Sequence, residues 1–555
     1  MRLHVLNPVA QTLEKKSSSA PRLSQLEGNT IGLYWNCKYG GDVSLKRVDE
    51  MLKARFAGLR TRSYAREMGD ADRARDGLKR IAQECAGVIG STAECGSCTA
   101  WLAHDMAELE KAGVPTVSFV ARDFVKPWQI DASQFGVGEL PKVVMAQPFA
   151  GMNAEDIHSQ VDSAFEALIK MLTQPMTREA GSKESSQAAE VIAIEGEDRY
   201  DALERMNRMF LSVGWGDGFP LWAPTRERVD AMLQGARRAP GEVVAVLAPG
   251  MGLATVEKIA INAVLAGCEP EHLPVLLAAV EAISDPRFVL GNVAVSTGAH
   301  APMMLVNGPL VQKLGINAGG CALGPGAPSA VNTVLGRAMR LIYMNLGHAY
   351  AGIMDFDTLG SPTKYSMCLG ENEAASPWEP YHVEKGFDRD ASVVTMFTTY
   401  ALSEVEDGTG ATPEAILNVT CSSACNMGPK SVGSWLLGRR GDSKTDAQAM
   451  EKHLLLVCPL HAAIYKKHGW TKQNIRDYLY EHARIPFGAF IARSSAAKFR
   501  SAHPELQGLW DSPQTLVPVL ETADCFEIVV AGGNSGARST YSYGAAEPVS
   551  RLIEQ

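Results

Sequence analysis

The sequence predicts an α/β protein in which an N-terminal, doubly wound parallel sheet is followed by a larger, mixed α/β region. Strand-like and helix-like segments alternate along the first 175 residues, and glycine-rich loops follow several apolar runs in the remainder. A chain of 555 residues is also too long for one hydrophobic core. We therefore expect domains at 1–175 and 193–555, joined by a polar linker at 176–192.

The N-terminal elements can be assigned in chain order from their periodicity and end signals. The expected segments are a strand with a Gly-Gly loop at 29–42, helices at 44–58 and 71–84, a strand at 85–90, a helix at 99–113 and a strand at 114–120. This β–loop–α–β order predicts parallel strands, and ligands bind such sheets at the carboxyl ends of the strands. Two cysteines, Cys95 and Cys98, fall on one of these loops.

Three segments of the larger region combine an apolar run with glycines. We expect a strand, a glycine-rich turn and a helix at 241–268 and again at 416–438, and a strand followed by a glycine-rich loop at 525–539. In the first segment, Gly250 and Gly252 would form an anion cradle before the helix. The order of the strands in this region cannot be assigned from the sequence.

Composition excludes several classes of protein. The net charge of −9 and the absence of a long Lys/Arg run argue against a nucleic-acid-binding protein. No apolar stretch reaches the length of a membrane span or of a signal-peptide core, so we expect a cytoplasmic protein that does not bind membranes. The eleven cysteines have no framework spacing, and a close pair in such a chain is more typical of catalysis or metal binding than of a structural disulfide.

The pair Cys95–Cys98 is the strongest chemical signal in the chain. It lies at the start of the predicted helix, where unpaired backbone N–H groups and the helix dipole favour a thiolate. A thiol three residues away can resolve a mixed disulfide. Two alternatives stay open, a structural zinc site and two inert buried thiols, although a zinc site normally needs further ligands.

The stretch "ECGSCTAWLAHDMAELEKAGVPTV" resembles the signature of the UGSC family of selenoproteins and their cysteine homologues. Cys95 occupies the selenocysteine position of that signature, followed by Gly-Ser-Cys-Thr, and Trp101, His104 and Asp105 match it too. The loop "NCKYGGD" resembles the family's Asn-x-Lys loop, with Tyr39 and Gly40 where Pro-Asn is more usual. Because selenium and sulphur interchange at one position, the resemblance implies that the Cys95 sulphur takes part in chemistry.

We expect the following residues of the N-terminal region to form a site. Cys95 would be the nucleophilic or redox thiolate and Cys98 the resolving thiol. Lys38 would stabilise the thiolate or hold a substrate anion, since its loop follows a neighbouring parallel strand. The remaining candidates are His104 as a catalytic residue, with a partly exposed helix histidine as the alternative, and Asn36 and Thr99 in substrate binding.

Polar residues on or near the glycine-rich passages of the larger region suggest a pocket for a small polar or carboxylate-bearing molecule. The candidates are Lys258, Asn262, His300, Asn307, Asn317, Asn332, Lys364 and Glu371. A metal bound by His300, His382, Glu371 and Glu373 is an alternative, but no established ligand spacing supports it, so we expect no cofactor.

The leading hypothesis is a thiol-dependent oxidoreductase acting on a small molecule, supported by an external thiol or reductase, and we expect a homo-oligomer. The alternatives are a lyase or hydrolase with its main site in the larger region, and a thiol-based sensor without turnover. We further expect a cleft between the domains, with Cys95 and Lys38 on one wall. Four residues would contribute to the other wall: His300, Asn307, Asn317 and Lys364.

Overall fold

The computed structural model of the chain describes most of the 555 residues, and the structural statements below concern these residues. They are 1–12, 19–67, 71–174, 190–408, 411–436, 440–442, 447–491, 500 and 504–554. Most of the linker expected at 176–192 lies outside the described residues.

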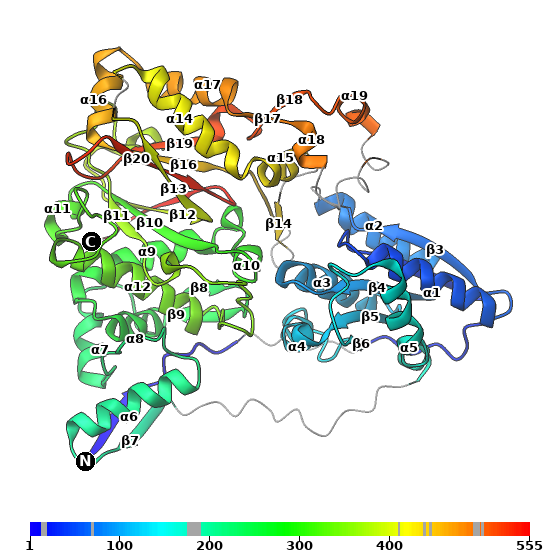
Figure 1. Ribbon diagram of the computed structural model, residues 1–555. Helices are drawn as coiled ribbons and strands as arrows, with labels where there is room; N and C mark the ends of the chain where they lie inside the picture. Colours follow the sequence, from blue (N-terminus) through cyan, green and yellow to red (C-terminus); the bar gives the residue numbers. More distant parts are fainter. Residues whose placement is uncertain are drawn as a thin grey trace.

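The N-terminal part contains a five-stranded sheet with the strand order β3-β2-β4-β5-β6 (Figure 1). Its strands are β2 Thr30–Trp35, β3 Arg60–Ala65, β4 Gly87–Ala93, β5 Thr116–Ala121 and β6 Lys142–Met145. All neighbouring strands run parallel. Because β3 lies on one side of β2 and β4 on the other, the chain reverses its direction across the sheet between β2 and β4.

Helices cover both faces of this sheet. Helices α1 (Gly41–Arg55) and α5 (Ala154–Thr173) pack on one face over a core that includes Leu45 and Phe165. The other face is covered by α2 Ala71–Glu84, α3 Gly96–Lys111 and α4 Val125–Gln134. The doubly wound parallel sheet predicted from the alternating pattern is therefore confirmed.

The first strand of the chain does not join this sheet. Strand β1 (Arg2–Leu6) pairs antiparallel with β7 (Val191–Glu195), and Leu3, Val5 and Leu6 belong to the core of the C-terminal part. The N-terminal sheet is thus inserted between two strands that pair with each other, a long-range contact that sequence periodicity does not reveal. The N-terminal domain expected at 1–175 therefore needs correction at its start, because β1 packs with the C-terminal part of the chain.

The C-terminal part contains two four-stranded mixed sheets, with the orders β11-β10-β12-β21 and β13-β20-β16-β19. The first consists of β10 Ala301–Asn307, β11 Cys368–Gly370, β12 Val393–Thr399 and β21 Val549–Leu552. The second consists of β13 Ala401–Glu406, β16 His453–Val457, β19 Phe526–Val530 and β20 Arg538–Tyr543. Short two-stranded sheets are formed by β8 Val243–Leu247 with β9 Gly252–Thr255, β14 Arg440–Asp442 with β15 Ala447–Ala449, and β17 Arg484–Pro486 with β18 Leu516–Pro518.

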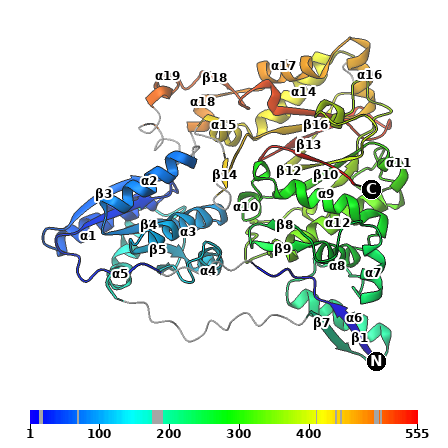
Figure 2. The same cartoon turned by 180° about the vertical axis from the view of Figure 1, so that it is seen from behind.

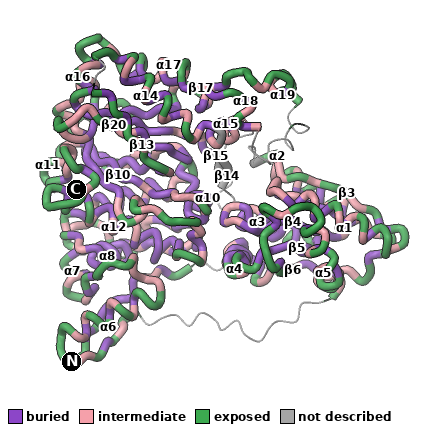
Figure 3. The backbone as a smooth tube through the Cα atoms, viewed as in Figure 1, coloured by how far each residue is buried: buried purple, intermediate pink, exposed green. Residues whose placement is uncertain are grey.

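The two larger sheets stack on each other between two layers of helices (Figure 1), and most of their strands are buried (Figure 3), whereas β13 is largely exposed. Alternate residues of β10 show why: Met303 and Leu305 pack between the sheets, whereas Met304 and Val306 pack against the helices of the first layer. That first layer contains α8 Val256–Ala266, α9 Leu273–Ser284 and α12 Ala330–Asn345. The second contains α14 Pro413–Asn426, α16 Pro459–Lys467 and α17 Lys472–His482.

Shorter or more peripheral helices complete the C-terminal part. They are α6 Arg199–Ser212, α7 Arg226–Leu233, α10 Leu290–Val293, α11 Leu310–Leu314, α13 Tyr381–Glu384, α15 Gly428–Leu436, α18 Phe487–Ile491 and α19 Gln507–Asp511. No described helix combines the length and the apolar character needed to cross a membrane.

The strand and the helix expected at 241–268 are confirmed by β8 and α8, but the anion cradle is wrong: the glycine turn closes the antiparallel hairpin β8–β9, and α8 begins only after Thr255, which caps it. The pattern expected at 416–438 is also wrong. In 416–438 the chain forms α14 and α15 instead of strand, turn and helix. Thr412 caps α14, and the buried residues of this helix recur at helical spacing. The strand and glycine-rich loop expected at 525–539 are confirmed by β19 and the residues that follow it.

The N-terminal sheet contacts the C-terminal part through α3, which lies beside α10 in both views (Figures 1 and 2). A Cβ added to Gly96 would lie 1.4 Å from the carbonyl oxygen of Val295, so the two backbones touch. A second contact joins Phe124 and Phe356, whose ring centroids are 4.7 Å apart. The start of α3, where the cysteine pair lies, is therefore part of the contact between the two parts.

Candidate functional site

The cysteine pair lies at the carboxyl end of β4, next to the loop that follows β2. Parallel sheets of this kind bind ligands where the strand order reverses, and here that point lies between β2 and β4. Asn36 and Lys38 follow β2, and Cys95 and Cys98 follow β4. The prediction that Cys95 lies at the carboxyl end of a parallel strand is confirmed.

Cys95 and Cys98 form a disulfide, with their Cα atoms 5.3 Å apart. Cys95 is the N-cap residue of α3, and its Sγ accepts a hydrogen bond from the backbone N–H of Cys98 at 3.3 Å. Cys95 is half-buried and Cys98 is buried, so Cys95 is the more accessible thiol, as expected. A sulphur that caps a helix accepts hydrogen bonds from backbone N–H groups, and the same hydrogen bonds stabilise a thiolate.

Asn36 and Thr99 hold the cysteine loop in place. The Asn36 amide donates to the carbonyl oxygens of Thr92 (2.9 Å) and Cys98 (3.3 Å) and accepts from the Thr92 N–H at 3.0 Å. The Thr99 hydroxyl donates to the Cys95 carbonyl at 2.6 Å. Both side chains are buried, so the structure places them as positioning residues of the loop, although we expected them to bind substrate.

Lys38 lies close to the cysteine loop, as predicted from its place after a neighbouring parallel strand. Its ammonium group is near Glu94, the residue before Cys95, and favours the ionised form of that carboxyl. Burial is the larger effect and raises the pKa of Glu94 above its ordinary value. One Glu94 oxygen accepts the backbone N–H of Phe149. A buried carboxyl directly before the cysteine was overlooked in the sequence, where "AECGSC" shows it.

His104 belongs to a polar cluster on α3 that includes Asp105, Arg66 and Tyr34. Its Nδ1 is 3.0 Å from Asp105, which also pairs with Arg66 (2.8 Å) and accepts from the Tyr34 hydroxyl (2.7 Å). Burial opposes ionisation of Asp105, but Arg66 and His104 outweigh it and lower its pKa to about 2. Arg66 also lies over the ring of Trp101, at 5.2 Å. These contacts join α3 to the ends of β2 and β3, which accounts for His104 and Asp105 without a catalytic role.

Lys258 and Asn262 lie on one face of α8, as expected, but their polar atoms are used within the chain. Lys258 donates to the carbonyl oxygen of Asn7 and pairs with Glu190, each at 2.8 Å. Asn262 donates to the carbonyl oxygen of Pro8 at 3.0 Å. Both therefore fasten the segment that follows β1, and neither forms the anion site that we expected from the sequence.

Two of the four residues expected on the second wall lie toward the N-terminal part. His300 precedes β10 and follows the loop of Val295, and its ring packs against Tyr400 at 4.3 Å. Lys364 pairs with Asp355 (2.8 Å) and Asp357 (2.9 Å), the two neighbours of Phe356, which contacts Phe124. Because these two carboxylates neutralise the Lys364 ammonium group, Lys364 stabilises the loop of Phe356.

Asn307 and Asn317 lie at the opposite end of the same lobe. Asn307 ends β10, and a seven-residue strand spans about 20 Å from the end that faces α3. Helix α11, which follows Asn307, lies on the far side of the lobe from α3 (Figure 1). Asn317 and Asn332 are hydrogen-bonded to each other and hold the glycine-rich passage at 317–326. The expected wall of four residues is therefore divided between two ends of the sheet.

The structure does bring together Asn307, Glu371, Glu373 and His382. The Asn307 amide donates to Glu371 and to Glu373 (3.1 Å), and His382 Nδ1 is 3.9 Å from Glu373. Burial raises the pKa of Glu371 to about 7. Within the described ranges, no group of three or more His, Cys, Asp or Glu side chains has the arrangement of a metal site.

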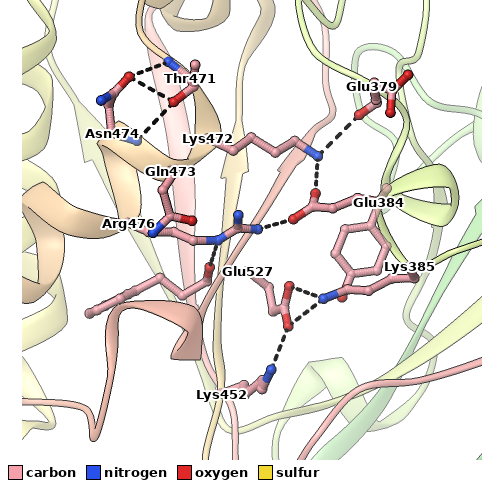
Figure 4. A network of polar contacts seen from close by, with 12 residues as sticks. Glu379, Glu384, Lys385, Lys452, Thr471, Lys472, Gln473, Asn474, Arg476 and Glu527 are labelled. Atoms are coloured by element: carbon pink, nitrogen blue, oxygen red, sulfur yellow. Dashed lines mark hydrogen bonds and ion pairs between the residues drawn. The ribbon is translucent and has the colours of Figure 1, made fainter.

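A neighbouring network of ion pairs lies between the C-terminal sheet and its helices, and its charged groups pair with one another (Figure 4). Glu527 is buried and pairs with Lys385 (2.8 Å) and Lys452 (3.3 Å), while Glu384 pairs with Lys472 (2.8 Å) and Arg476. Each of these two carboxylates thus has two cations, which is the arrangement expected of a structural ion-pair network.

Comparisons with known proteins concern the part of the chain that carries Cys95. Residues 4–174 match the sequence model of the UGSC family. Neither a curated protein nor a solved structure matches the chain. The matched residues include the cysteine loop, the loop of Asn36 and Lys38, and all five strands of the parallel sheet. The match to the UGSC family therefore covers the N-terminal part of this chain, residues 4–174, which is followed by a larger C-terminal part.

Proposed function

We propose that the protein is a thiol-dependent oxidoreductase in which Cys95 attacks a small substrate and Cys98 resolves the adduct. The observation that carries this proposal is the cysteine pair itself, which is close enough to form a disulfide at the N-terminus of a 16-residue helix. Its place at the point where the strand order reverses is the usual position of a ligand site in this kind of sheet.

The reaction begins from the dithiol form. The Cys95 thiolate forms a covalent bond with the substrate, and the Cys98 thiolate then attacks the Cys95 sulphur. The disulfide forms as the bond between sulphur and substrate breaks, and the departing group keeps the electron pair and takes up a proton. The substrate gains two electrons, the two thiols lose them, and an external thiol reductant restores the dithiol.

Neighbouring groups support both halves of this cycle. The Cys98 N–H, which points at Cys95 Sγ, stabilises negative charge on the attacking sulphur, and Lys38 supplies a positive charge at the same loop. Burial raises the pKa of Glu94 above its ordinary value, which increases the capacity of this carboxyl to hold and donate a proton beside the cysteine loop. Asn36 keeps the loop in the geometry that lets the sulphurs meet.

The substrate side of the site would be completed by the C-terminal part. Val295 lies against Gly96, and the loop of Phe356 contacts Phe124, so any molecule at Cys95 borders both parts. We expect a small polar or carboxylate-bearing substrate, with Lys38 as the cation that holds it. A sensor that cycles between dithiol and disulfide without turnover uses the same residues, and the experiment below does not need a substrate.

A redox titration of the full chain tests the proposal. The protein is equilibrated in buffers of reduced and oxidised glutathione, free thiols are alkylated, and the Cys95–Cys98 peptide is quantified by mass spectrometry. We expect a reversible two-electron transition between about −270 and −120 mV, the range of dedicated thiol–disulfide enzymes. Cys95→Ser and Cys98→Ser should each abolish it, and Cys85→Ser, a buried thiol of the same sheet, should not. A disulfide that does not form, or that resists reduction below about −300 mV, would contradict a redox function.

A further inference from the structure

A hollow in the second helix layer, at the top of Figure 1, is lined by α17 and by the turn that joins it to α16. Its volume is about 420 Å³. The residues of α17 that line it are spaced i, i+3, i+4 and i+7, so they share one face of that helix. The lining comprises His468, Trp470, Asn474, Asp477, Tyr478 and Glu481.

Two half-buried aromatic rings contribute to the walls of the hollow. The ring centroids of Trp470 and Tyr478 are 5.8 Å apart, with an angle of 57° between the ring planes. Trp470 packs against the buried Tyr465 (centroids 6.4 Å apart), and its carbonyl oxygen accepts the indole N–H of Trp378 at 2.9 Å. The Tyr478 hydroxyl donates to the Asn418 side chain at 3.0 Å. These contacts hold both rings in place, so a ligand does not have to order them.

Two exposed carboxylates, Asp477 and Glu481, border the same hollow. They are four residues apart on α17, which separates them by about 6 Å along the helix axis. Asp477 accepts a hydrogen bond from the Gln473 amide at 2.8 Å, and the Glu481 carboxylate has no hydrogen bond or ion pair with the residues that the structure describes. Like charges at this spacing destabilise a helix, so a cation bound beside both carboxylates would relieve their repulsion.

The cations nearest in the sequence are used elsewhere. Lys472 and Arg476 lie on the opposite face of α17, where both pair with Glu384 (Figure 4). Arg484, just beyond the end of the helix, donates to the backbone carbonyl oxygen of Glu481 at 2.9 Å. These three side chains therefore leave the negative charge of the hollow to a ligand.

We propose that this hollow binds a linear aliphatic diamine or polyamine. The methylene chain of the ligand lies on the rings of Trp470 and Tyr478, whose faces also attract ammonium groups. The two carboxylates, one helical turn apart, match two ammonium groups that are joined by a short alkyl chain. An anion would be repelled by Asp477 and Glu481, which distinguishes this hollow from the site for a carboxylate-bearing substrate proposed beside Cys95.

The test is a titration of the full chain with 1,4-diaminobutane at low ionic strength, followed by saturation-transfer NMR of the methylene protons of the diamine. We expect saturable binding that is at least about 3-fold tighter than the binding of n-butylamine, because n-butylamine carries a single ammonium group. Asp477→Asn combined with Glu481→Gln should weaken binding of the diamine by about 5-fold or more. Trp470→Leu should weaken it by about 3-fold through loss of the aromatic face.

A matched control separates this site from attraction by the net negative charge of the chain. Asp72→Asn combined with Asp76→Asn removes two carboxylates with the same spacing from α2, where they pair with Arg75 (3.0 Å) and Lys79 (2.9 Å). This variant changes the net charge by the same amount and should bind the diamine as the parent chain does.

Because Asp477 and Glu481 are exposed, their double variant should keep the thermal unfolding midpoint of the parent chain, so that weaker binding reports on the hollow and not on the fold. Four results would each overturn the proposal: no saturable binding, equal losses in the two double variants, n-butylamine that binds as tightly as the diamine, or undiminished binding by Trp470→Leu. The cysteine pair takes no part in this measurement, so its outcome is independent of the redox function proposed above.

Discussion

The backbone of Gly96 lies against the backbone of Val295, so closely that a Cβ at position 96 would stand 1.4 Å from the Val295 carbonyl oxygen. Gly96 separates Cys95 from Ser97 in the cysteine loop, and Val295 belongs to the C-terminal part. The glycine therefore serves the contact between the two parts of the chain, in addition to the turn of the loop.

Gly96→Ala should separate the start of α3 from the loop of Val295. The added methyl group cannot be accommodated without backbone movement, because both neighbours are main chain. We expect a larger radius of gyration by small-angle scattering and faster reaction of the reduced Cys95 with iodoacetamide. Gly138→Ala is the control, since a Cβ there meets no atom within 4 Å. Scattering and alkylation rates equal to those of the wild type would show that the contact does not hold the two parts together.

Asn36→Ala should destabilise the N-terminal part by about 1–3 kcal/mol, because the carbonyl oxygens of Thr92 and Cys98 and the Thr92 N–H lose a buried partner. Urea unfolding followed by tryptophan fluorescence measures this loss. Asn29→Ala removes an amide that bonds the Gln25 carbonyl near the surface and should change the midpoint little. If the two variants unfold alike, Asn36 does not tether the cysteine loop.

The ion pair of Asp105 should make the N-terminal part sensitive to acid. The pKa of Asp105 falls from 3.8 to about 2 on folding, so this carboxylate stabilises the fold above pH 4 and the contribution is lost between about pH 4 and pH 2. The shift corresponds to about 2–3 kcal/mol. Asp105→Asn should flatten the pH dependence of unfolding in that window. A variant that keeps the wild-type slope between pH 4 and pH 2 would contradict the assignment.

Glu371→Gln should stabilise the protein at alkaline pH. Because the pKa of Glu371 is raised to about 7, its folded form holds a proton that the unfolded chain releases, and stability falls as the pH rises from about 4.5 to 7. A glutamine oxygen can still accept from the Asn307 amide and from the Tyr381 N–H. We expect the variant to match the wild type at pH 4 and to exceed it by about 3 kcal/mol at pH 8. A loss of stability at pH 8 would mean that the fold stabilises the Glu371 carboxylate, which contradicts a raised pKa.

The parallel sheet and its thiol site follow from the sequence because both depend on local patterns. The alternation of strands and helices fixes the sheet, and the start of a helix after a buried strand places Cys95 and Cys98. Lys38 was found by the same rule, since loops after neighbouring parallel strands meet.

The features that could not be predicted depend on contacts between segments distant in the sequence. The pairing of β1 with β7 joins strands that are separated by the whole parallel sheet. From the sequence, Lys258 and Asn262 are expected to bind a ligand. In the fold they donate hydrogen bonds to the segment of Asn7 and Pro8. His300 and Asn307 are close in sequence, but a strand holds them at opposite ends of the lobe. Periodicity does not reveal which partner a polar side chain meets.

The pH dependence of Cys95 alkylation in the reduced full chain tests the central claim most directly. Single time points with iodoacetamide between pH 5 and pH 10, resolved by mass spectrometry, give a rate for each cysteine. The account predicts that Cys95 reacts ahead of Cys98 and Cys37, with its rate reaching half-maximum well below pH 8.5, the ordinary thiol pKa. A Cys95 rate that rises only above pH 8.5, or that never exceeds the rate of Cys98, would contradict a thiolate nucleophile at the start of α3.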